Sequence, residues 1–302
     1  MRRLYLKSTM ITAHAGCEGT GLDTMDSIHK ALELHADAAE IDVRMDPLGS
    51  LRISHDPLSI EDYLKKNPLE DVFNVLRDTS MLINFEVKEP RVFPKTLEAA
   101  EAQGFPTERL IFSGRLGPGH LSGDKRYMDS AAFFLNIEEV LKYVFVQRKA
   151  ELGWKLFSIL IRDPYVLLIE EGAALPDPYI FRAKTIQRKL SAVSKMIREI
   201  MIEETARIYV SFHAAAANIP KFLLGLPSIG YLRTEKVPLS VWTVDSPEVL
   251  RLCMAAEVYN ITTRSVSLAK QVRTDYIREA AAGHSLPIGE GGDDLPAVSS
   301  VG

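Results

Sequence analysis

Charged side chains occupy alternate positions in two short apolar segments of this sequence. Glu40 and Asp42 alternate with apolar residues in AAEIDVR, and Glu86 and Lys88 do so in LINFEVK. In an extended strand, residues two apart point to the same face. Carboxylates on a core-facing side are costly to bury unless a cation pairs with them. If Glu40, Asp42 and Glu86 converge, they form an oxygen cage suited to Mg²⁺ or Ca²⁺.

Two histidines accompany these acids. His14 follows an apolar segment near the start of the chain, and His55 stands in SHDP after a turn. Imidazole accepts and donates protons near neutral pH. Beside a metal and a lysine, such a pair suits cleavage of a phosphate ester. One histidine activates the nucleophile and the other protonates the leaving group, while the cations stabilise the phosphorus oxygens.

The elements that must position these residues alternate along the chain. Apolar segments rich in β-forming residues predict eight strands, at 10–15, 38–44, 82–88, 109–113, 131–137, 207–213, 239–244 and 260–263. Helical patterns fill several of the gaps between them, and LRIS after DPLGS predicts a hairpin strand. Eight strands separated by helices predict an α/β fold, the (β/α)8 TIM barrel. Active sites of this fold lie at the carboxyl ends of the strands.

A long stretch between the predicted fifth and sixth strands exceeds what one crossover helix needs. We interpret about 140–205 as an inserted helical element over a single barrel domain, 1–284. Its apolar part, 154–169, favours elaborated packing, with a lid or a membrane-contacting surface as the alternative. Residues 285–302 lack apolar periodicity and are expected to be a disordered tail.

Composition narrows the protein class. Of 302 residues, 46% are hydrophobic and 25% are charged, which excludes disorder as the dominant state. The net charge of -4 argues against nucleic acid as a partner. The two cysteines, Cys17 and Cys253, exclude a disulfide framework. With no signal-peptide pattern, a cytoplasmic location is expected.

Short motifs in the first third of the chain resemble the glycerophosphodiester phosphodiesterase family. They are AHAG, LDT, EIDV, HD and FEVK, in the family's order, where the family has AHRG, ENT, ExDV, HD and ExK. A second block, SVWTVD and NITTR, resembles its later strands. The resemblance implies a TIM barrel that hydrolyses glycerophosphodiesters to an alcohol and glycerol phosphate with a divalent metal.

The resemblance also assigns roles to individual residues. It implies an acid/base pair (His14, His55), metal ligands (Glu40, Asp42, Glu86), a phosphate contact (Lys88) and a residue at the barrel mouth (Trp242). A packing role in the barrel core is the alternative for Trp242. A small-molecule phosphodiester is therefore the expected substrate, and the oligomeric state is left open.

The sequence departs from the family pattern at three positions. Ala15 stands where the family has an arginine, Leu22 replaces a glutamate, and Thr263 replaces an aspartate. Arg44 shares the face of Glu40 and Asp42, so it is a candidate replacement for the missing arginine. His213, at the end of the predicted sixth strand, is a candidate substrate contact, with a packing role as the alternative.

Two other functions stay open at this level. One is a phospholipase-D-like lyase acting on lipid phosphodiesters, with peripheral membrane contact through 154–169. The other is a non-catalytic barrel that binds phosphate or metal, which the three departures from the family pattern motivate.

Overall fold

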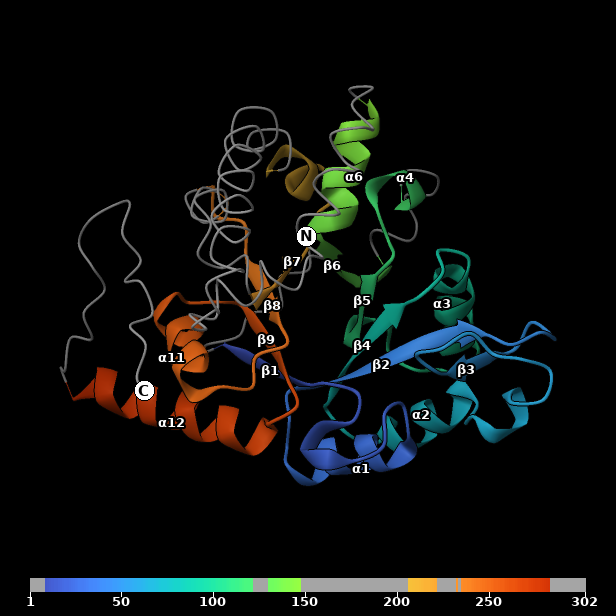
Figure 1. Cartoon of the computed structure of the whole chain (residues 1–302), viewed down its shortest axis with the longest axis horizontal. Helices are drawn as coiled ribbons and strands as arrows, with labels where there is room; N and C mark the ends of the chain where they lie inside the picture. Colours follow the sequence, from blue (N-terminus) through green and yellow to red (C-terminus); the bar gives the residue numbers. More distant parts are fainter. Residues whose placement is uncertain (1–8, 122–129, 148–205, 222–231, 233–234, 283–302) are drawn as a thin grey trace, which may run out of the picture.

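The computed structural model describes residues 9–121, 130–147, 206–221, 232 and 235–282, and these residues form a closed barrel (Figure 1). Eight parallel strands follow each other around it, and β1 pairs with both β9 and β2, which closes the ring. The prediction of a TIM barrel is confirmed. The strands are β1 (Met10–Ala13), β2 (Ala38–Met45), β4 (Leu82–Val87), β5 (Leu110–Gly114), β6 (Ala132–Asn136), β7 (Ala216–Pro220), β8 (Leu239–Trp242) and β9 (Asn260–Thr263).

The predicted hairpin is also present. β3 (Leu51–Ile53) pairs antiparallel with the end of β2, beyond the residues of β2 that pair with β1. The intervening turn is held by Asp46, whose Oδ1 accepts the backbone N–H groups of Leu48 and Ser50 at 2.9 Å. The hairpin therefore projects beside the carboxyl end of β2.

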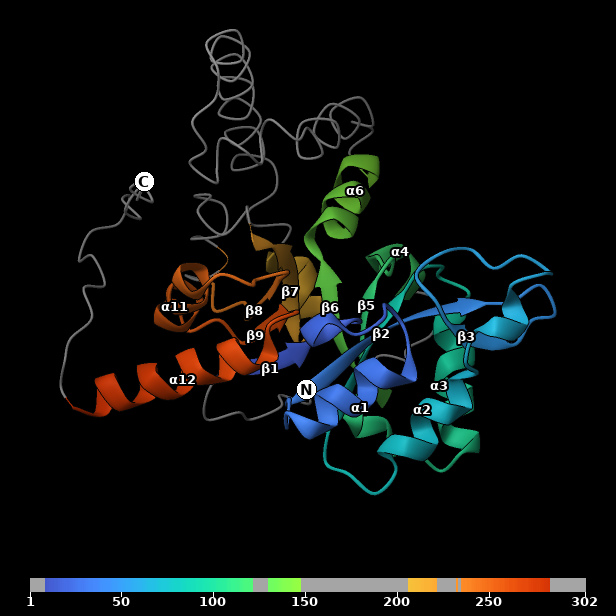
Figure 2. The same ribbon diagram turned by 60° about the horizontal axis from the view of Figure 1, so that its bottom comes forward.

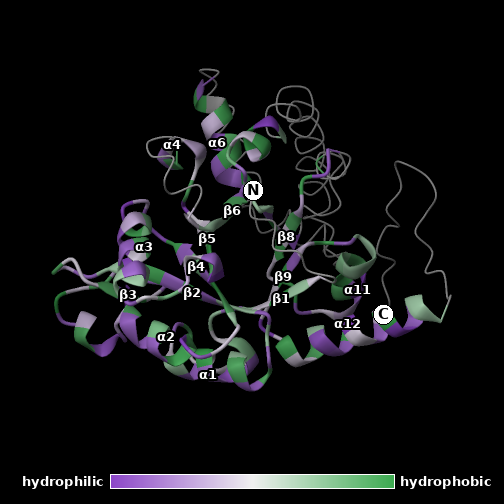
Figure 3. Cartoon of the chain, turned by 180° about the vertical axis from the view of Figure 1, so that it is seen from behind, coloured by the Kyte–Doolittle hydropathy of each residue, from purple (hydrophilic) through white to green (hydrophobic). Residues whose placement is uncertain are grey.

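Helices lie outside the strands (Figure 2). Thr24 and Ser246 cap two of them by accepting a backbone N–H with their hydroxyl groups. Several helices show both hydrophobic and hydrophilic residues along their length, as expected when one face packs on a sheet (Figure 3). They are α1 (Met25–Glu33), α2 (Leu69–Leu76), α3 (Val92–Ala102), α4 (Pro118–Leu121), α6 (Ile137–Gln147), α11 (Pro247–Ala255) and α12 (Val266–Ala281), with single turns at η1 (Cys17–Gly19), η2 (Tyr63–Lys65) and η3 (Thr107–Arg109).

The hydrophobic core lies between barrel and helices. Phe85 and Phe112, on outward positions of β4 and β5, contact Phe73 of α2 and Phe93 of α3, with ring centroids 5.9 and 4.8 Å apart. A smaller apolar cluster fills the inward face near the amino ends of the strands: Met10, Ala38, Ile111, Phe134 and Ala216. The barrel therefore has an apolar floor, and its polar residues lie above it.

One inward-facing row is uncharged and fully hydrogen-bonded. The Thr12 hydroxyl donates to Asn260 at 2.7 Å, Asn260 donates to Ser240 at 2.9 Å, and Ser240 donates to Asn218 at 2.8 Å. Asn218 donates in turn to Asn136 at 2.8 Å. We call these five residues the neutral row. It ties β1, β9, β8, β7 and β6 together across half of the barrel.

The predicted sixth strand is wrong. Residues 206–211 are helical, and the strand is Ala216–Pro220. RIYVSFH has high β propensity, but Ala206 and Tyr209 are buried three residues apart, and the Tyr209 hydroxyl donates to the carbonyl of Leu135 at 3.1 Å. AANIP has weak propensity, yet all five of its residues are buried. Tertiary burial therefore overrode the local preference.

Other predictions fall partly or wholly outside the described residues. The inserted element lies beyond them from 148 to 205, including the apolar part 154–169, and so does the tail 285–302; the limits of the domain stay predictions. Among the described helices, none is long and apolar enough to cross a membrane. Cys17 and Cys253 are both free and buried.

Candidate active site

Three carboxylates converge where β2 and β4 run side by side. Each of Glu40, Asp42 and Glu86 offers an oxygen, and these oxygens lie within 4.8 Å of one another. Asp42 is the direct register partner of Glu86 on the adjacent strand, and Glu40 precedes Asp42 by two residues. Glu40 is 8% exposed and Asp42 4%. The alternation expected from the sequence therefore places all three acids on the inward face.

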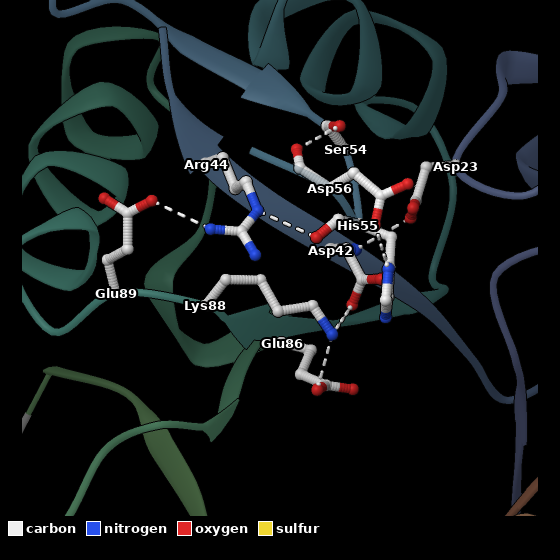
Figure 4. A network of polar contacts seen from close by, with 9 residues as sticks. All are labelled: Asp23, Asp42, Arg44, Ser54, His55, Asp56, Glu86, Lys88 and Glu89. Carbon is white, nitrogen blue, oxygen red and sulfur yellow. Dashed lines mark hydrogen bonds and ion pairs between the residues drawn. The ribbon is translucent and has the colours of Figure 1, made fainter. Parts of the chain in front are cut away.

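Lys88 neutralises part of this charge. Its Nζ lies 2.9 Å from Asp42 Oδ1 and 2.7 Å from Glu86 Oε1 (Figure 4). Burial lowers the pKa of Lys88, but the Glu86 and Asp42 carboxylates outweigh it and raise the pKa above the usual value. Lys88 is therefore a charged ammonium held between two of the three acids.

One ammonium does not balance three acids. Burial, followed by repulsion from Glu86, raises the pKa of Asp42 to about 8. The same two causes raise the pKa of Glu40 well above its usual value. For Glu86, burial raises the pKa, but a hydrogen bond with Glu40 and the charge of Lys88 bring it below the usual value. Without further positive charge nearby, Glu40 and Asp42 therefore favour the protonated form.

The donor set fits a divalent cation. Hard cations such as Mg²⁺ and Ca²⁺ prefer carboxylate oxygens. Glu40 Oε2 is buried and has no hydrogen-bond partner, which leaves an unsatisfied acceptor beside the cluster. A cation among the three acids would satisfy that oxygen and relieve their repulsion.

His14 stands just beyond β1, the strand that neighbours β2. Its backbone N–H donates to Thr263, and its ring Nδ1 lies 2.6 Å from the carbonyl oxygen of Ala15. A carbonyl only accepts, so Nδ1 carries the proton and Nε2 is left as a base. Burial lowers the pKa of His14, against the effect of the Ala15 hydrogen bond. His14 is therefore a neutral imidazole near pH 7.

His55 lies in the loop after β3 and is exposed. Its Nδ1 is 2.9 Å from Asp56 Oδ1, and this hydrogen bond lowers the pKa of Asp56. The opposite ring nitrogen faces the side of the site that holds Lys88 (Figure 4). The two histidines predicted from the sequence therefore stand on separate loops at the same end of the barrel as the acids.

Arg44 positions the His55 loop. Its Nε donates to the carbonyl oxygen of His55 at 2.8 Å, and its Nη1 pairs with Glu89 Oε1 at 2.9 Å. The guanidinium is thus engaged on two sides by protein groups. Arg44 lies near Lys88 and Asp42 in Figure 4, and its contacts tie together the loops that follow β3 and β4.

The two remaining predicted residues differ in position. Trp242 is the last residue of β8, at the carboxyl end of the barrel, and its Nε1 is buried without a partner. His213 was expected beside the site, and that expectation is wrong. It is exposed in a turn before the first residue of β7. The amino end of a parallel strand lies at the opposite end of the barrel from the acids.

Asp23 was not predicted as a site residue. It is 4% exposed, and its Oδ1 accepts the backbone N–H of Asp42 at 3.1 Å. Its loop position carried no strand or helix pattern. The signal in the sequence was its place in LDT, directly before the residue that caps α1.

The three departures from the family pattern have distinct surroundings. Ala15 is buried, and its carbonyl oxygen orients His14. Leu22 is 46% exposed, whereas Thr263 is buried and donates to Asp245 at 3.0 Å. Asp245 also accepts the backbone N–H of Arg264 and lies 3.6 Å from its guanidinium. None of the three supplies a charge to the site.

Comparisons with known proteins give a likeness of fold. No family model and no curated protein sequence matches the chain. Among solved structures, a glycerophosphodiester phosphodiesterase from Thermotoga maritima is 18% identical, with a TM-score of 0.56, over 89% of this chain and 100% of that one. A putative glycerophosphoryl diester phosphodiesterase from Silicibacter pomeroyi is 11% identical, with a TM-score of 0.59, over 90% and 95%.

A third similar structure contains a ligand. It is a phosphodiesterase from Oleispira antarctica in complex with the product sn-glycerol-3-phosphate, 14% identical, with a TM-score of 0.54, over 88% of this chain and 96% of that one. At these identities the comparisons establish that this chain has the same barrel fold as those proteins.

Proposed function

We propose that this protein is a metal-dependent phosphodiesterase that hydrolyses glycerophosphodiesters to an alcohol and glycerol phosphate. One observation carries the proposal. Three carboxylates gather within reach of one cation at the carboxyl end of a TIM barrel, with a lysine between them and histidines on the adjoining loops. The fold shared with glycerophosphodiester phosphodiesterases supports the same reaction class. The substrate is a small molecule, as the glycerol phosphate in one of them suggests.

Glu40, Asp42 and Glu86 hold the cation in this proposal. A bound Mg²⁺ or Ca²⁺ supplies positive charge that polarises a phosphoryl oxygen and orients the diester. Lys88, already between Asp42 and Glu86, provides a second positive charge for the phosphate.

The histidines divide the proton transfers. His14 keeps Nε2 unprotonated because Nδ1 donates to Ala15, so His14 serves as the general base. It takes a proton from water or from the hydroxyl of the substrate that neighbours the phosphate. His55, with Nδ1 fixed by Asp56, is left to protonate the leaving alcohol from its opposite nitrogen.

Two residues complete the mouth. Arg44 holds the carbonyl of His55 and so keeps that ring over the site. Trp242 offers an apolar ring and an unpartnered N–H at the carboxyl end of β8. Trp242 therefore lines the mouth and contacts the substrate beyond its phosphate.

Turnover of glycerophosphocholine with Mg²⁺ or Ca²⁺ tests the proposal. We expect activity that EDTA abolishes and that added metal restores. His14→Ala should lower kcat by about 10²- to 10⁴-fold, the range typical of a lost general base. The exposed His213 is the matched control, because His213→Ala removes an imidazole at the other end of the barrel. Activity that persists in both EDTA and His14→Ala would refute the proposal.

The products identify the nucleophile. Phosphorus NMR that shows glycerol phosphate from the first turnover supports attack by water. A cyclic phosphate that accumulates would instead assign a lyase, with the substrate hydroxyl as nucleophile. Metal binding without turnover across a broad diester panel would assign a non-catalytic binding barrel.

A further inference from the structure

Asp23 is a buried carboxylate that the mechanism above does not use. It lies between β1 and α1, directly before the capping residue Thr24, and is 4% exposed. Its backbone φ is 50°, in the left-handed region that aspartate tolerates better than most residues. The start of α1 therefore holds Asp23 in one place.

The two oxygens of Asp23 have different surroundings. Oδ1 accepts the backbone N–H of Asp42 at 3.1 Å, whereas Oδ2 is buried with no hydrogen-bond partner. The charge of the Asp23 carboxylate also contributes to the raised pKa of Asp42. In Figure 4 it stands beside Asp42 and His55. A buried acceptor of this kind needs a donor or a cation close by.

The local charges also show a lack of positive charge around Asp23 and the three other acids. With Asp23 included, four carboxylates surround the site, and Lys88 is the ammonium that contacts two of them. Two guanidinium groups at this end of the barrel are engaged elsewhere, since Arg44 pairs with Glu89 and Arg264 with Asp245. A phosphodiester adds another negative charge. A divalent cation is therefore more strongly attracted than the three inner acids alone would attract it.

We infer that Asp23 is a fourth, outer carboxylate of the cation site. Its oxygens are not part of the group that lies within 4.8 Å, so it does not share the cation directly with Glu40, Asp42 and Glu86. Instead Oδ1 fixes the backbone of Asp42, and the unpartnered Oδ2 would accept a hydrogen bond from a water bound to the cation. Mg²⁺ keeps several such waters when proteins bind it. The inference rests on the proposed metal dependence.

Mn²⁺ binding by calorimetry tests this role. Asp23→Asn keeps an oxygen for the Asp42 N–H but removes the charge. We expect Mn²⁺ affinity to fall about tenfold, as for other residues that orient metal ligands. The metal-free protein should melt at a higher temperature, because one of two adjacent carboxylates is gone. A merely structural aspartate would show the reverse, with lower melting temperature and unchanged affinity.

Asp26→Asn is the matched control. Asp26 lies in the first turn of α1, three residues further on, and is exposed. The substitution changes the net charge equally, so Mn²⁺ affinity equal to wild type is expected. An equal loss in Asp26→Asn would overturn the inference, because it would show a general charge effect.

Lanthanide luminescence lifetimes in H₂O and D₂O distinguish an outer carboxylate from a direct ligand. For bound Tb³⁺, Asp23→Asn should leave the number of coordinated waters unchanged. A gain of one water would overturn the outer placement, and Mn²⁺ affinity equal to wild type would overturn the role altogether. If wild type binds no Mn²⁺, the proposed function fails as well, so the two failures are distinguishable.

Discussion

Two polar regions face each other across the interior of this barrel, and they are built on different principles. The neutral row on β1, β9, β8, β7 and β6 has no charge, and each amide or hydroxyl in it hydrogen-bonds its neighbour. The acidic region on β2 and β4, with Asp23 beside it, has repelling carboxylates and three buried oxygens without partners, on Glu40, Asn84 and Asp23. A network whose polar groups are all hydrogen-bonded stabilises the fold. A network with unpaired buried groups indicates a binding site, because a ligand can supply the missing partners.

The difference shows that burial of polar groups alone does not identify a site. Asn260 and Ser240 are as buried as Asp42, yet Asn260 donates a hydrogen bond to Ser240, so both side chains have protein partners. Of these two groups of residues, the acidic one has buried oxygens that no described protein group satisfies. The two regions should therefore respond in opposite ways to substitution.

The largest effect is expected in the acidic region. Asp42→Asn should lower phosphodiesterase activity by about 10³-fold, because a lost metal ligand removes several kcal/mol of charge stabilisation. The metal-free variant should nevertheless be at least as stable as wild type in urea, because a carboxylate that repels Glu86 is gone. A marked loss of stability would mean that the acids are structural, like the neutral row.

The neutral row should show the reverse response. Asn260→Leu keeps a similar side-chain volume but leaves the buried Thr12 hydroxyl without its acceptor and Ser240 without its donor. We expect the free energy of unfolding to fall by about 3 kcal/mol, as typical for two orphaned polar groups. Mn²⁺ affinity of the folded variant should stay within a factor of two of wild type. Unchanged stability would contradict the comparison.

The response to pH should separate the regions further. The pKa of Asp42 in the metal-free folded protein, about 8, lies above that of an unfolded chain. The protonated Asp42 carboxyl therefore contributes fully to the stability of the folded protein at low pH. This contribution is lost as pH rises through 8. The pKa of Glu86 is lowered, so the change in stability caused by its ionisation occurs at more acidic pH.

Because a cation binds the ionised acids, its binding releases protons. The rise in melting temperature caused by Mg²⁺ should accordingly grow between pH 5.5 and 8.5, as measured by differential scanning fluorimetry with and without the metal. Asp42→Asn should flatten this dependence. Asn260→Leu should leave it unchanged, since no group in the neutral row titrates.

The smallest effect is expected at His213. It is exposed and lies at the amino end of β7, away from both regions. His213→Ala should change kcat/KM for the diester by less than a factor of two. A loss of tenfold or more would show that the mouth extends to the other end of the barrel.

Most of the fold could be predicted from the sequence, and the exceptions have physical causes. Seven strands follow from short β-rich segments, because each is long enough to show its pattern. β7 was missed because Ala, Asn and Pro are weak strand formers and the strand exists through burial on both faces. The helix at 206–211 was missed because Tyr209 and its neighbours favour strands, while contacts with β6 decide the outcome.

The candidate site divides in the same way. Glu40, Asp42, Glu86 and Lys88 were predictable because strand alternation is a local property of two neighbouring strands. The ion pair of Arg44 was not predictable, since its partner Glu89 lies 45 residues away in the chain. The prediction of His213 as a site residue was wrong because it depended on the predicted sixth strand, which does not form.

By itself, the sequence determined that acids and a lysine share one face of two strands, because side-chain direction alternates with a fixed period of two. Only the tertiary structure decided which buried polar groups are satisfied. Closure of β1 onto β9 and β2 brings residues hundreds of positions apart into contact, as with Thr12 and Asn260. It also sets Asp23 against Asp42, and such partnerships depend on distances in space that no local pattern encodes.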